Sequence, residues 1–355
     1  MTRRLRICTI VGARPQFVKA AVVSRALKAR GVVEAIIHTG QHYDQTMSQI
    51  FFDEMGIEPP QANLSVGSAP HGEQTARMMI GIENELTRER FDWLLVYGDT
   101  NSTLAGALVA AKMGIPIAHV EAGLRSFNRQ MPEEVNRVLT DHVSNRLFCP
   151  TATAVENLRQ EGVTDGVVLT GDVMLDATAY FAERSSRMYP LDRLIDFPAG
   201  GYYLATVHRA ENTGDLDRFA AIADAFGRLD RPVVWPAHPR TRPLLDAVEL
   251  SSNVRLIEPV GYLAMLQLIQ NAHAVLTDSG GVQKEAYWLG TPCITLRDET
   301  EWVETLAGDW NQLVGADAQA IIAAVNRRPS ADRAPFGEPE HGTASDLIAA
   351  SLFDN

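Results

Sequence analysis

The chain of 355 residues is longer than one ordinary hydrophobic core supports, and this length predicts two domains. Its hydrophobic fraction of 46% and charged fraction of 21% are typical of a soluble globular protein. A formal net charge of -12 argues against a nucleic-acid partner, because neutralising a phosphate backbone requires clustered Lys and Arg. The same charge still allows one small basic pocket for a phosphorylated metabolite.

Neither the start of the chain nor its cysteines indicate export. The first residues, MTRRLRICTIVGARPQ, contain an apolar run that is short and is followed at once by Arg14, which favours a first β-strand over a signal peptide. No apolar run approaches the roughly 20 residues that cross a bilayer. Cys8, Cys149 and Cys293 lack metal-ligand spacing and lie in apolar segments, so reduced, buried thiols are expected. We therefore expect a cytoplasmic protein with no membrane segment.

In the first half of the chain, short β-branched runs alternate with longer amphipathic segments. The predicted strands are residues 6–11, 32–38, 93–97, 117–120, 147–149 and 167–169. The predicted helices are residues 14–30, 47–55, 71–87, 100–113, 133–144 and 151–161. This alternation favours a parallel sheet that is covered by helices on both faces.

The alternation pauses after residue 171, and residues 185–201, which contain two prolines and two glycines, are interpreted as a connection. It resumes with predicted strands at 202–207, 233–236, 254–256, 274–277 and 293–296, and helices at 216–229, 241–248, 262–271 and from 281. The predicted fold class is α/β, with two Rossmann-like, doubly wound domains and an interdomain cleft. The domains are residues 1–172 and 173–342, and for a terminal helix in 343–355 the sequence leaves both domains open, with packing back on the first domain as one alternative.

Ionisable side chains follow many of the predicted strands. In open α/β sheets, ligands bind beyond the C-terminal ends of the strands, so these positions are the candidates for a site. They are Arg14, Lys19, Gln41, His42, Asp99, Glu121, His208, Arg209, His238, Arg240 and Ser279. One such residue has an ordinary explanation, for example an N-cap for Asp99 or a solvated first turn for Arg14. About ten of them together favour a site.

Three acids could form a carboxylate cluster. Asp99 and Glu121 each follow an apolar strand, and Glu133 opens a helix after Pro132. Neighbouring carboxylates raise one another's pKa, which leaves one able to donate a proton and another able to accept one. The alternative for Glu133 is a favourable acid in the first turn of a helix.

The stretch TDSGGVQKEAYWL, residues 277–289, is interpreted as a strand end, a turn and a helix start. Gly280 and Gly281 allow a bound group close to the backbone, and the helix N-terminus suits a phosphate. Glu285, one helical turn further, could reach a pair of ribose hydroxyls, although a tight turn with a solvated Glu is the simpler alternative. No metal-ligand spacing, GxSxG elbow or Walker loop occurs, so no metal site and no cofactor are predicted.

The segments GARPQ, TGQH, GDTNST, HVEAGLRS, MPEE, TVHRAEN, HPR and TDSGGVQKE stand in this order along the chain. As a set, this pattern resembles the non-hydrolysing UDP-N-acetylglucosamine 2-epimerase family of bacteria, from residue 6 to about 315. The resemblance implies a fold like glycosyltransferase-B (GT-B), a UDP-sugar in the cleft and a homodimer. It also implies an isomerase that converts UDP-GlcNAc to UDP-ManNAc for surface polysaccharide synthesis.

The resemblance also implies residue roles. Ser279, Gly280 and Gly281 would hold the diphosphate and Glu285 the ribose, while Arg14 and His208 would bind phosphate or steer the leaving group. Asp99, Glu121 and Glu133, with Lys19 nearby, would be the acid/base groups around C2 of the sugar. Further substrate-binding residues would be Gln41, His42, Arg209 and His238 on the matched segments, together with Tyr262, Met265 and Arg297.

The implied reaction is anti-elimination of UDP to a 2-acetamidoglucal, followed by re-addition with the other face of C2 protonated. The C2–H bond lies beside no carbonyl, so direct proton removal would be prohibitive. Departure of UDP makes C1 cationic and C2–H acidic enough for a carboxylate. Because C2 has two faces, two differently placed groups are required. This requirement explains why the site would contain more than one acid.

Three departures bear on the substrate. TGQH is followed by Tyr43 and Asp44, and an Arg often found in 65–71 is absent, which argues against activation by substrate. Trp302 stands where UDP-N-acetylglucosamine enzymes commonly have Arg, and Met265 stands where an aromatic residue often lies by the uracil. The segments that contain Tyr43, Asp44 and Trp302 are closer in sequence to relatives that act on UDP-2,3-diacetamido-glucuronic acid, which is therefore the alternative substrate.

Other functions with the same fold remain open at the level of sequence. A GT-B glycosyltransferase needs one base at most, so clustered acids favour epimerisation over transfer. A hydrolysing epimerase would release the glucal with free UDP. A non-catalytic nucleotide-sugar sensor has no use for acids that repel a diphosphate.

Overall fold

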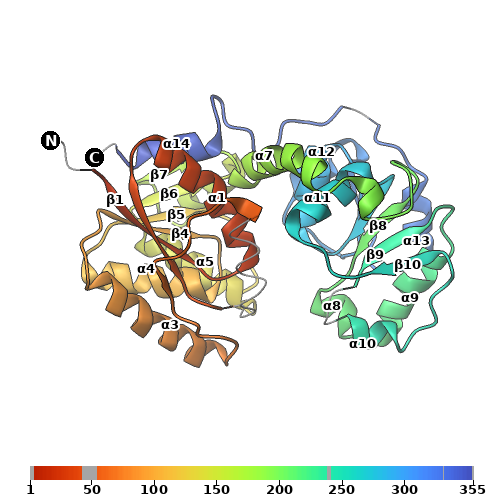
Figure 1. Ribbon diagram of the computed structural model, residues 1–355, viewed down its shortest axis with the longest axis horizontal. Coiled ribbons are helices and arrows are strands. Elements are labelled where there is room, and N and C mark those ends of the chain that lie inside the picture. Colours follow the sequence, from red (N-terminus) through yellow and green to blue (C-terminus); the bar gives the residue numbers. More distant parts are fainter. Residues whose placement is uncertain (1–3, 42–53, 238–240, 331, 354–355) are drawn as a thin grey trace. The chain divides into compact units, whose positions relative to one another are not determined.

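The computed structural model describes residues 4–41, 54–237, 241–330 and 332–353. The chain divides into two compact units: unit 1 is Met1–Ala177 with Gly337–Asn355, and unit 2 is Thr178–Phe336. These divisions lie a few residues from the predicted boundaries at 172 and 342. The first lies inside a helix, α7, which runs from Val173 to Met188 and contributes residues to both units (Figure 1).

Unit 1 contains a seven-stranded parallel sheet with the order β3-β2-β1-β4-β5-β6-β7. The strands are β1 Arg6–Val11, β2 Val33–His38, β3 Ala62–Asn63, β4 Trp93–Tyr97, β5 Ile117–Val120, β6 Arg146–Cys149 and β7 Val167–Leu169. Strand β4 is buried along its whole length, and β1 is buried after its first residue. This burial explains their continuous apolar sequences, since a strand covered on both faces has no solvent side.

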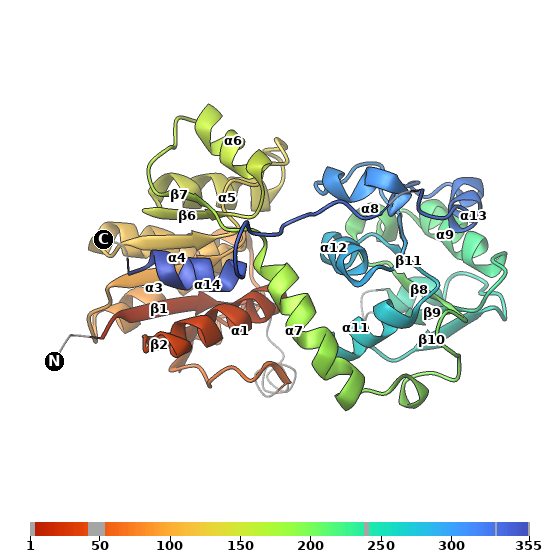
Figure 2. The ribbon, with the colours of Figure 1, turned by 90° about the horizontal axis from the view of Figure 1, so that it is seen from above.

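The helices of unit 1 cover both faces of this sheet. They are α1 Arg14–Ala29, α3 His71–Leu86, α4 Asn101–Met113, α5 Pro132–Val143, α6 Ala152–Gln160 and α14 Ala344–Ser351. Helices α3, α4 and α5 lie side by side on one face, whereas α1 and α14 lie together on the other (Figures 1 and 2). Thr100 caps α4 by accepting a hydrogen bond from the Thr103 amide, and Gly114 ends the helix in the left-handed conformation, φ +69°.

Helix α14 is attached to unit 1 by specific hydrogen bonds. The Asp176 carboxylate accepts hydrogen bonds from the backbone amides of Ala344, at 3.4 Å, and Ser345, at 2.7 Å. A carboxylate at these amides also interacts favourably with the positive end of the helix dipole. The terminal helix therefore belongs to the same unit as the start of the chain.

Unit 2 repeats the architecture with a six-stranded parallel sheet of order β10-β9-β8-β11-β12-β13. The strands are β8 Tyr203–Thr206, β9 Val233–Pro236, β10 Val254–Ile257, β11 Ala274–Thr277, β12 Cys293–Thr295 and β13 Asn311–Leu313. The helices are α8 Ala210–Thr213, α9 Leu216–Gly227, α10 Arg242–Leu245, α11 Tyr262–Asn271, α12 Gly280–Leu289 and α13 Ala318–Val325, and two 3-10 segments are η1 Leu191–Arg193 and η2 Val303–Asp309. Helices α9 and α13 pack on one face around Phe219, Phe226 and Trp235. Helices α11 and α12 pack on the other.

Several elements differ from the sequence predictions. Helix α7 was not predicted, and its last residues, 185–188, were assigned to a connection; β3, β13, α8 and α13 were not predicted either. Most of the predicted helix 47–55 falls outside the described residues, which include only its last two positions. Within the described ranges, no helix is both long and apolar enough to cross a membrane.

Candidate functional site

Each sheet has one point at which the strand order reverses. In unit 1 the point lies between β1 and β4, and in unit 2 it lies between β8 and β11. Chains that leave neighbouring strands in opposite directions open a crevice at such a switch point, which is where ligands bind in this class of fold. The two switch points contain most of the candidate residues.

At the switch point of unit 1, the acids form a charged cluster with two cations. Glu121 is paired with the Lys19 ammonium, and Asp99 is paired with the Arg137 guanidinium. A Cβ atom at Gly98 would lie 3.6 Å from Lys19 Nζ and 4.0 Å from Glu121 Oε1, so this pair sits against the backbone that precedes Asp99. Lys19, Asp99 and Glu121, separated by up to about 100 positions in sequence, are therefore brought together.

Burial shifts the proton affinity of Asp99. Desolvation raises the pKa of Asp99 above its ordinary value and the Glu121 charge adds to the rise, although Arg137 and Lys19 oppose it. A carboxyl group with a raised pKa keeps its proton to a higher pH than an ordinary aspartic acid, and a protonated carboxyl group can donate to a reacting atom. Asp99 thus has the electrostatic surroundings of a general acid.

Helix α5 presents two neighbouring acids with different environments. Glu134 is buried and accepts hydrogen bonds from the Ser126 and Phe127 amides, each at 2.9 Å, so it holds a loop in place. Glu133 is exposed. Glu133 precedes Arg137 by one helical turn, so both lie on the same face of α5. The structure thus places Glu133 on the helix that binds Asp99, but not inside the ion-paired cluster.

The other candidates of unit 1 surround the exits of β1 and β2. Arg14 begins α1, and burial lowers the pKa of its guanidinium. Gln41 accepts hydrogen bonds from Ser102 N at 3.0 Å and Ser102 Oγ at 2.6 Å, so its amide oxygen caps the start of α4. This contact gives Gln41 a structural function at the switch point. His42 lies outside the described residues.

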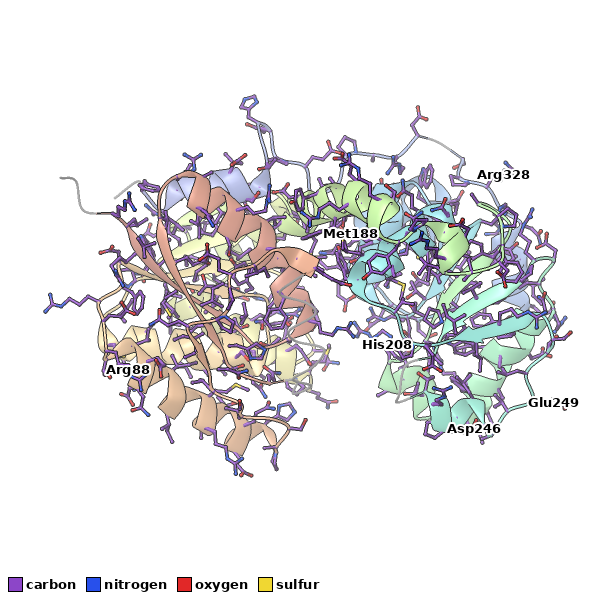
Figure 3. The ribbon with its side chains drawn as sticks, in the orientation of Figure 1. Arg88, Met188, His208, Asp246, Glu249 and Arg328 are labelled. Carbon is purple, nitrogen blue, oxygen red and sulfur yellow. The ribbon has the colours of Figure 1, made fainter. Side chains whose placement is uncertain are left out.

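In unit 2, Asp278 organises the exit of β8. This buried carboxylate accepts hydrogen bonds from the backbone amides of His208 and Arg209, both at 3.0 Å, and from Asn212 Nδ2 at 3.0 Å. The His208 ring lies 3.5 Å from Asp278 and is partly exposed at the end of the strand (Figure 3). Two candidates, His208 and Arg209, are thus tied to the residue before Ser279. The candidate His238 lies outside the described residues.

The glycine turn begins α12 as predicted from its sequence. Ser279 is the N-cap of α12, and its Oγ accepts a hydrogen bond from the Val282 amide. A Cβ atom at Gly280 would lie only 3.1 Å from Trp302 Nε1 and 3.9 Å from an Arg209 nitrogen. An indole N–H, a guanidinium and a helix N-terminus therefore converge on one turn, and all three suit a phosphate.

Glu285 lies one turn into α12 and is 5% exposed. Desolvation raises the pKa of Glu285 to about 8, although the neighbouring Lys284 charge and the Tyr262 side chain lower it. Tyr262 and Met265 stand on α11 with the i, i+3 spacing that places them on one face. The structure thus brings Tyr262 to Glu285.

Arg297 follows β12 and completes the polar surroundings of the turn. Its guanidinium binds both Glu301 oxygens, at 2.8 and 3.3 Å, and Arg209 lies 3.9 Å from the same carboxylate. Burial alone would raise the pKa of Glu301, but Arg297 and Arg209 bring it below its ordinary value. Glu301 therefore holds both arginines near the glycine turn.

Sequence reasoning missed the residues that hold the candidates in position, among them Gln16, Arg137, Asn212, Asp278 and Glu301. Gln16, Asn212 and Asp278 stand inside quoted segments and Arg137 follows MPEE by three positions, whereas Glu301 lies outside all of them. Polar residues beside a candidate were the available signal, but their partners lie up to 87 positions away in the chain. Among the described residues, no group of three or more His, Cys, Asp and Glu side chains is arranged to hold a metal ion.

The protein has two Rossmann-like units. The first has acids at its switch point and the second has a helix N-terminus at its own switch point, and these features define an α/β enzyme suited to a phosphorylated ligand. A family model described as UDP-N-acetylglucosamine 2-epimerase matches residues 25–352. The chain therefore belongs to this family, and the resemblance inferred from its motifs is confirmed.

Individual relatives agree along almost the whole chain. The chain is 50% identical to UDP-2,3-diacetamido-2,3-dideoxy-D-glucuronate 2-epimerase of Pseudomonas aeruginosa, over 90% of each chain. It is 52% identical to a UDP-N-acetylglucosamine 2-epimerase homolog of Methanococcus maripaludis, over 91% of this chain and 92% of that one. The structure of Methanocaldococcus jannaschii UDP-GlcNAc 2-epimerase, in complex with UDP-GlcNAc and UDP, matches with a TM-score of 0.88 and 41% identity, over 99% of this chain and 100% of that one. The predicted two-domain α/β fold of the GT-B type is confirmed, and the cleft between the domains stays a prediction.

Proposed function

We propose that the protein is a non-hydrolysing UDP-sugar 2-epimerase that interconverts UDP-GlcNAc and UDP-ManNAc. The observation that carries this proposal is the cluster of Asp99 and Glu121 with Lys19 and Arg137 at the switch point of unit 1. Two acids in different electrostatic surroundings are what proton removal from one face of a carbon and delivery to the other require. Family membership supports the same reaction class.

We assign nucleotide binding to unit 2. The N-terminus of α12, Trp302 Nε1 and the Arg209 guanidinium would bind the diphosphate, since all three favour anions. Glu285 would bind the ribose hydroxyls from within the same helix. His208, held by Asp278, is placed beside this turn and would stabilise the charge that develops on departing UDP.

We assign the chemistry at the sugar to unit 1. A carboxylate takes the proton from C2 while the C1–O bond breaks, so that a C1=C2 double bond forms and UDP leaves with the bonding electrons. In the return step, UDP oxygen attacks C1 and a carboxylic acid protonates the opposite face of C2. The raised pKa of Asp99 supports it as the proton donor. We assign Glu121 to the other face of C2. Glu133 would assist from α5.

Deuterium incorporation tests the proposal directly. The protein is incubated with UDP-GlcNAc in D₂O, and NMR follows deuterium at C2 and the appearance of the epimer. The expected result is deuterium at C2 with the sugar still attached to UDP. A glycosyltransferase or a non-catalytic binder would incorporate none, and a hydrolysing enzyme would release free UDP and sugar, so either result contradicts the proposal. Glu121→Gln should abolish exchange while UDP still binds.

A second candidate substrate is UDP-2,3-diacetamido-2,3-dideoxy-glucuronic acid. The relative of that activity in P. aeruginosa is 50% identical to this chain. In addition, Trp302, an aromatic residue at a position where Arg is common in UDP-N-acetylglucosamine enzymes, lies directly against Gly280. Measuring kcat/KM for both sugars under the same conditions decides between them, because the true substrate should be preferred at least tenfold.

We further propose a cytoplasmic homodimer. The three cysteines are free and buried, which suits a reducing compartment. Ile80 on α3 and Val135 and Leu139 on α5 are large apolar side chains exposed on the face of unit 1 that these helices cover, and a second copy would bury them. Sedimentation should give twice the chain mass for the wild type, and Leu139→Asp should shift the protein toward the monomer.

A further inference from the structure

Unit 1 contains a chain of charged side chains, buried except at its last member, Glu161, that takes no part in the proposed chemistry. Asp141 lies between His119 Nδ1, at 2.7 Å, and Arg125 Nη1, also at 2.7 Å. Arg125 in turn donates two hydrogen bonds to Glu161, both at 2.7 Å. His119 and Asp141 are 0% exposed. Removing such groups from water is costly, so their arrangement requires an explanation beyond packing.

The ring of His119 is held between two oxygen atoms that act only as acceptors. Nε2 lies 2.8 Å from the Gly98 carbonyl oxygen, and Nδ1 lies against Asp141. Burial alone would raise the pKa of Asp141, but His119 and Arg125 bring it below its ordinary value, so this group is a carboxylate. Because a carbonyl and a carboxylate cannot donate, both ring nitrogens must carry hydrogen. Charges of alternating sign therefore run from His119 to Glu161.

This chain of charges holds the backbone on both sides of the two candidate acids. The Gly98 carbonyl that His119 binds immediately precedes Asp99, and Gly98 has φ +62°. His119 itself stands two residues before Glu121, whose φ of +74° is unusual for a residue with a side chain. Asp141 Oδ2 also accepts a hydrogen bond from the Gly123 amide, at 3.1 Å. One ion-paired group thus restrains the peptide before Asp99 and the turn that contains Glu121.

We propose that His119 is a positioning residue that sets the orientation of Asp99 and Glu121 relative to each other. It touches neither the substrate nor the reacting atoms, and it acts by binding the Gly98 carbonyl while Asp141 holds the next turn. The inference rests on the proposed function, since it concerns the two acids to which that function assigns proton transfer. Small displacements of catalytic groups have large effects on rate, so loss of this restraint should reduce turnover far more than nucleotide binding.

Two substitutions separate positioning from general structural support. His119→Phe keeps a ring but removes both donors, and His119→Gln keeps one amide donor that can reach the Gly98 carbonyl. We expect kcat to fall about 100-fold in His119→Phe and about 10-fold in His119→Gln, with UDP Kd, a property of unit 2, unchanged within twofold. The control is Ile82→Ala, which opens a cavity under α3 in the core of unit 1, away from both turns. It should lower the melting temperature while retaining kcat per folded molecule.

A second measurement on the wild type needs no variant. ¹⁵N NMR of histidine-labelled protein should show one ring with both nitrogens protonated, and this signal should be missing from His119→Gln. If His119→Phe does not fold, the His119→Gln variant alone tests the positioning role. The inference is overturned if kcat of His119→Gln equals that of the wild type, if Ile82→Ala loses as much kcat, or if the His119 ring carries a single hydrogen. Failure of the proposed function has a different signature, because the wild type itself would then incorporate no deuterium.

Discussion

Substitution of Glu285 provides a quantitative test of the electrostatics of unit 2. The carboxyl group is buried and its pKa is raised from 4.5 to about 8 by desolvation. Between these two values the folded protein holds a proton that the unfolded chain has released. Stability is therefore fully present below pH 4.5 and is lost as the pH rises toward 8.

The magnitude follows from the two pKa values. With about 1.4 kcal/mol per pKa unit, Glu285 lowers the free energy of unfolding by roughly 2.5 kcal/mol between pH 5 and pH 7. A further decrease of about 1.4 kcal/mol follows between pH 7 and pH 9, after which the folded group is also ionised. In Glu285→Gln neither contribution exists. The variant should therefore gain stability relative to the wild type as the pH rises, by these amounts.

Urea unfolding at pH 5, 7 and 9 measures this difference. Tryptophan fluorescence reports mainly on unit 2, because four of the five tryptophans lie there: Trp235, Trp288, Trp302 and Trp310. Glu249→Gln removes an exposed acid from the same unit and is the matched control, with an expected difference that does not change over this range (Figure 3). A difference between Glu285→Gln and the wild type that is equal at all three pH values would refute the reasoning, since Glu285 would then ionise alike in both states.

Four further substitutions test unit 1. Gly123→Ala and Gly162→Ala both place a side chain at φ +79°, but only the Gly123→Ala side chain also overlaps a carbonyl oxygen of α6. Urea unfolding should therefore show Gly123→Ala to be less stable than Gly162→Ala by about 2 kcal/mol or more. Equal losses in the two variants would contradict this. Arg137→Gln removes a cation that lowers the pKa of Asp99, so the pH at which kcat declines on the alkaline side should move upward, and a downward shift would exclude Asp99 as the donor. Asp176→Ala removes the acceptor for the first amides of α14, so hydrogen exchange in α14 should accelerate about fivefold, from a loss of about 1 kcal/mol.

The fold was predictable from sequence because its strands are buried on both faces and read as continuous apolar runs between amphipathic helices. Helix α7 was missed because its first part follows the paired glycine and aspartate of residues 171–172 and its last part lies next to Pro190. Strand β13 has only three residues, with Asn311 and Gln312 buried rather than apolar side chains, so it gives no periodic signal. Such elements are specified by tertiary contacts and not by local pattern.

The candidate site was predictable only where position after a strand was informative. This rule found Asp99 and Glu121, and the ribose argument found Glu285, because each is a polar residue at a strand end or one turn into the next helix. It could not identify Arg137 as the partner of Asp99, since the two are 38 positions apart and Arg137 lies in the middle of a helix. It also gave no indication that His119 has a carbonyl and a carboxylate as its two partners, because that depends on tertiary folding.

The return of the chain to unit 1 after residue 336 has a consequence for biosynthesis. Residues Thr178–Phe336 form a complete compact unit by themselves, whereas Met1–Ala177 lack α14 until Gly337–Asn355 have been made. During translation, which proceeds at roughly 5–20 residues per second, every residue of unit 2 is therefore synthesised before the last helix of unit 1. A nascent chain stalled before residue 337 should show α1 without its neighbour α14 and an Asp176 carboxylate without the amides of that helix. The part of the enzyme to which we assign proton transfer is thus completed last, when the nucleotide-binding part already exists.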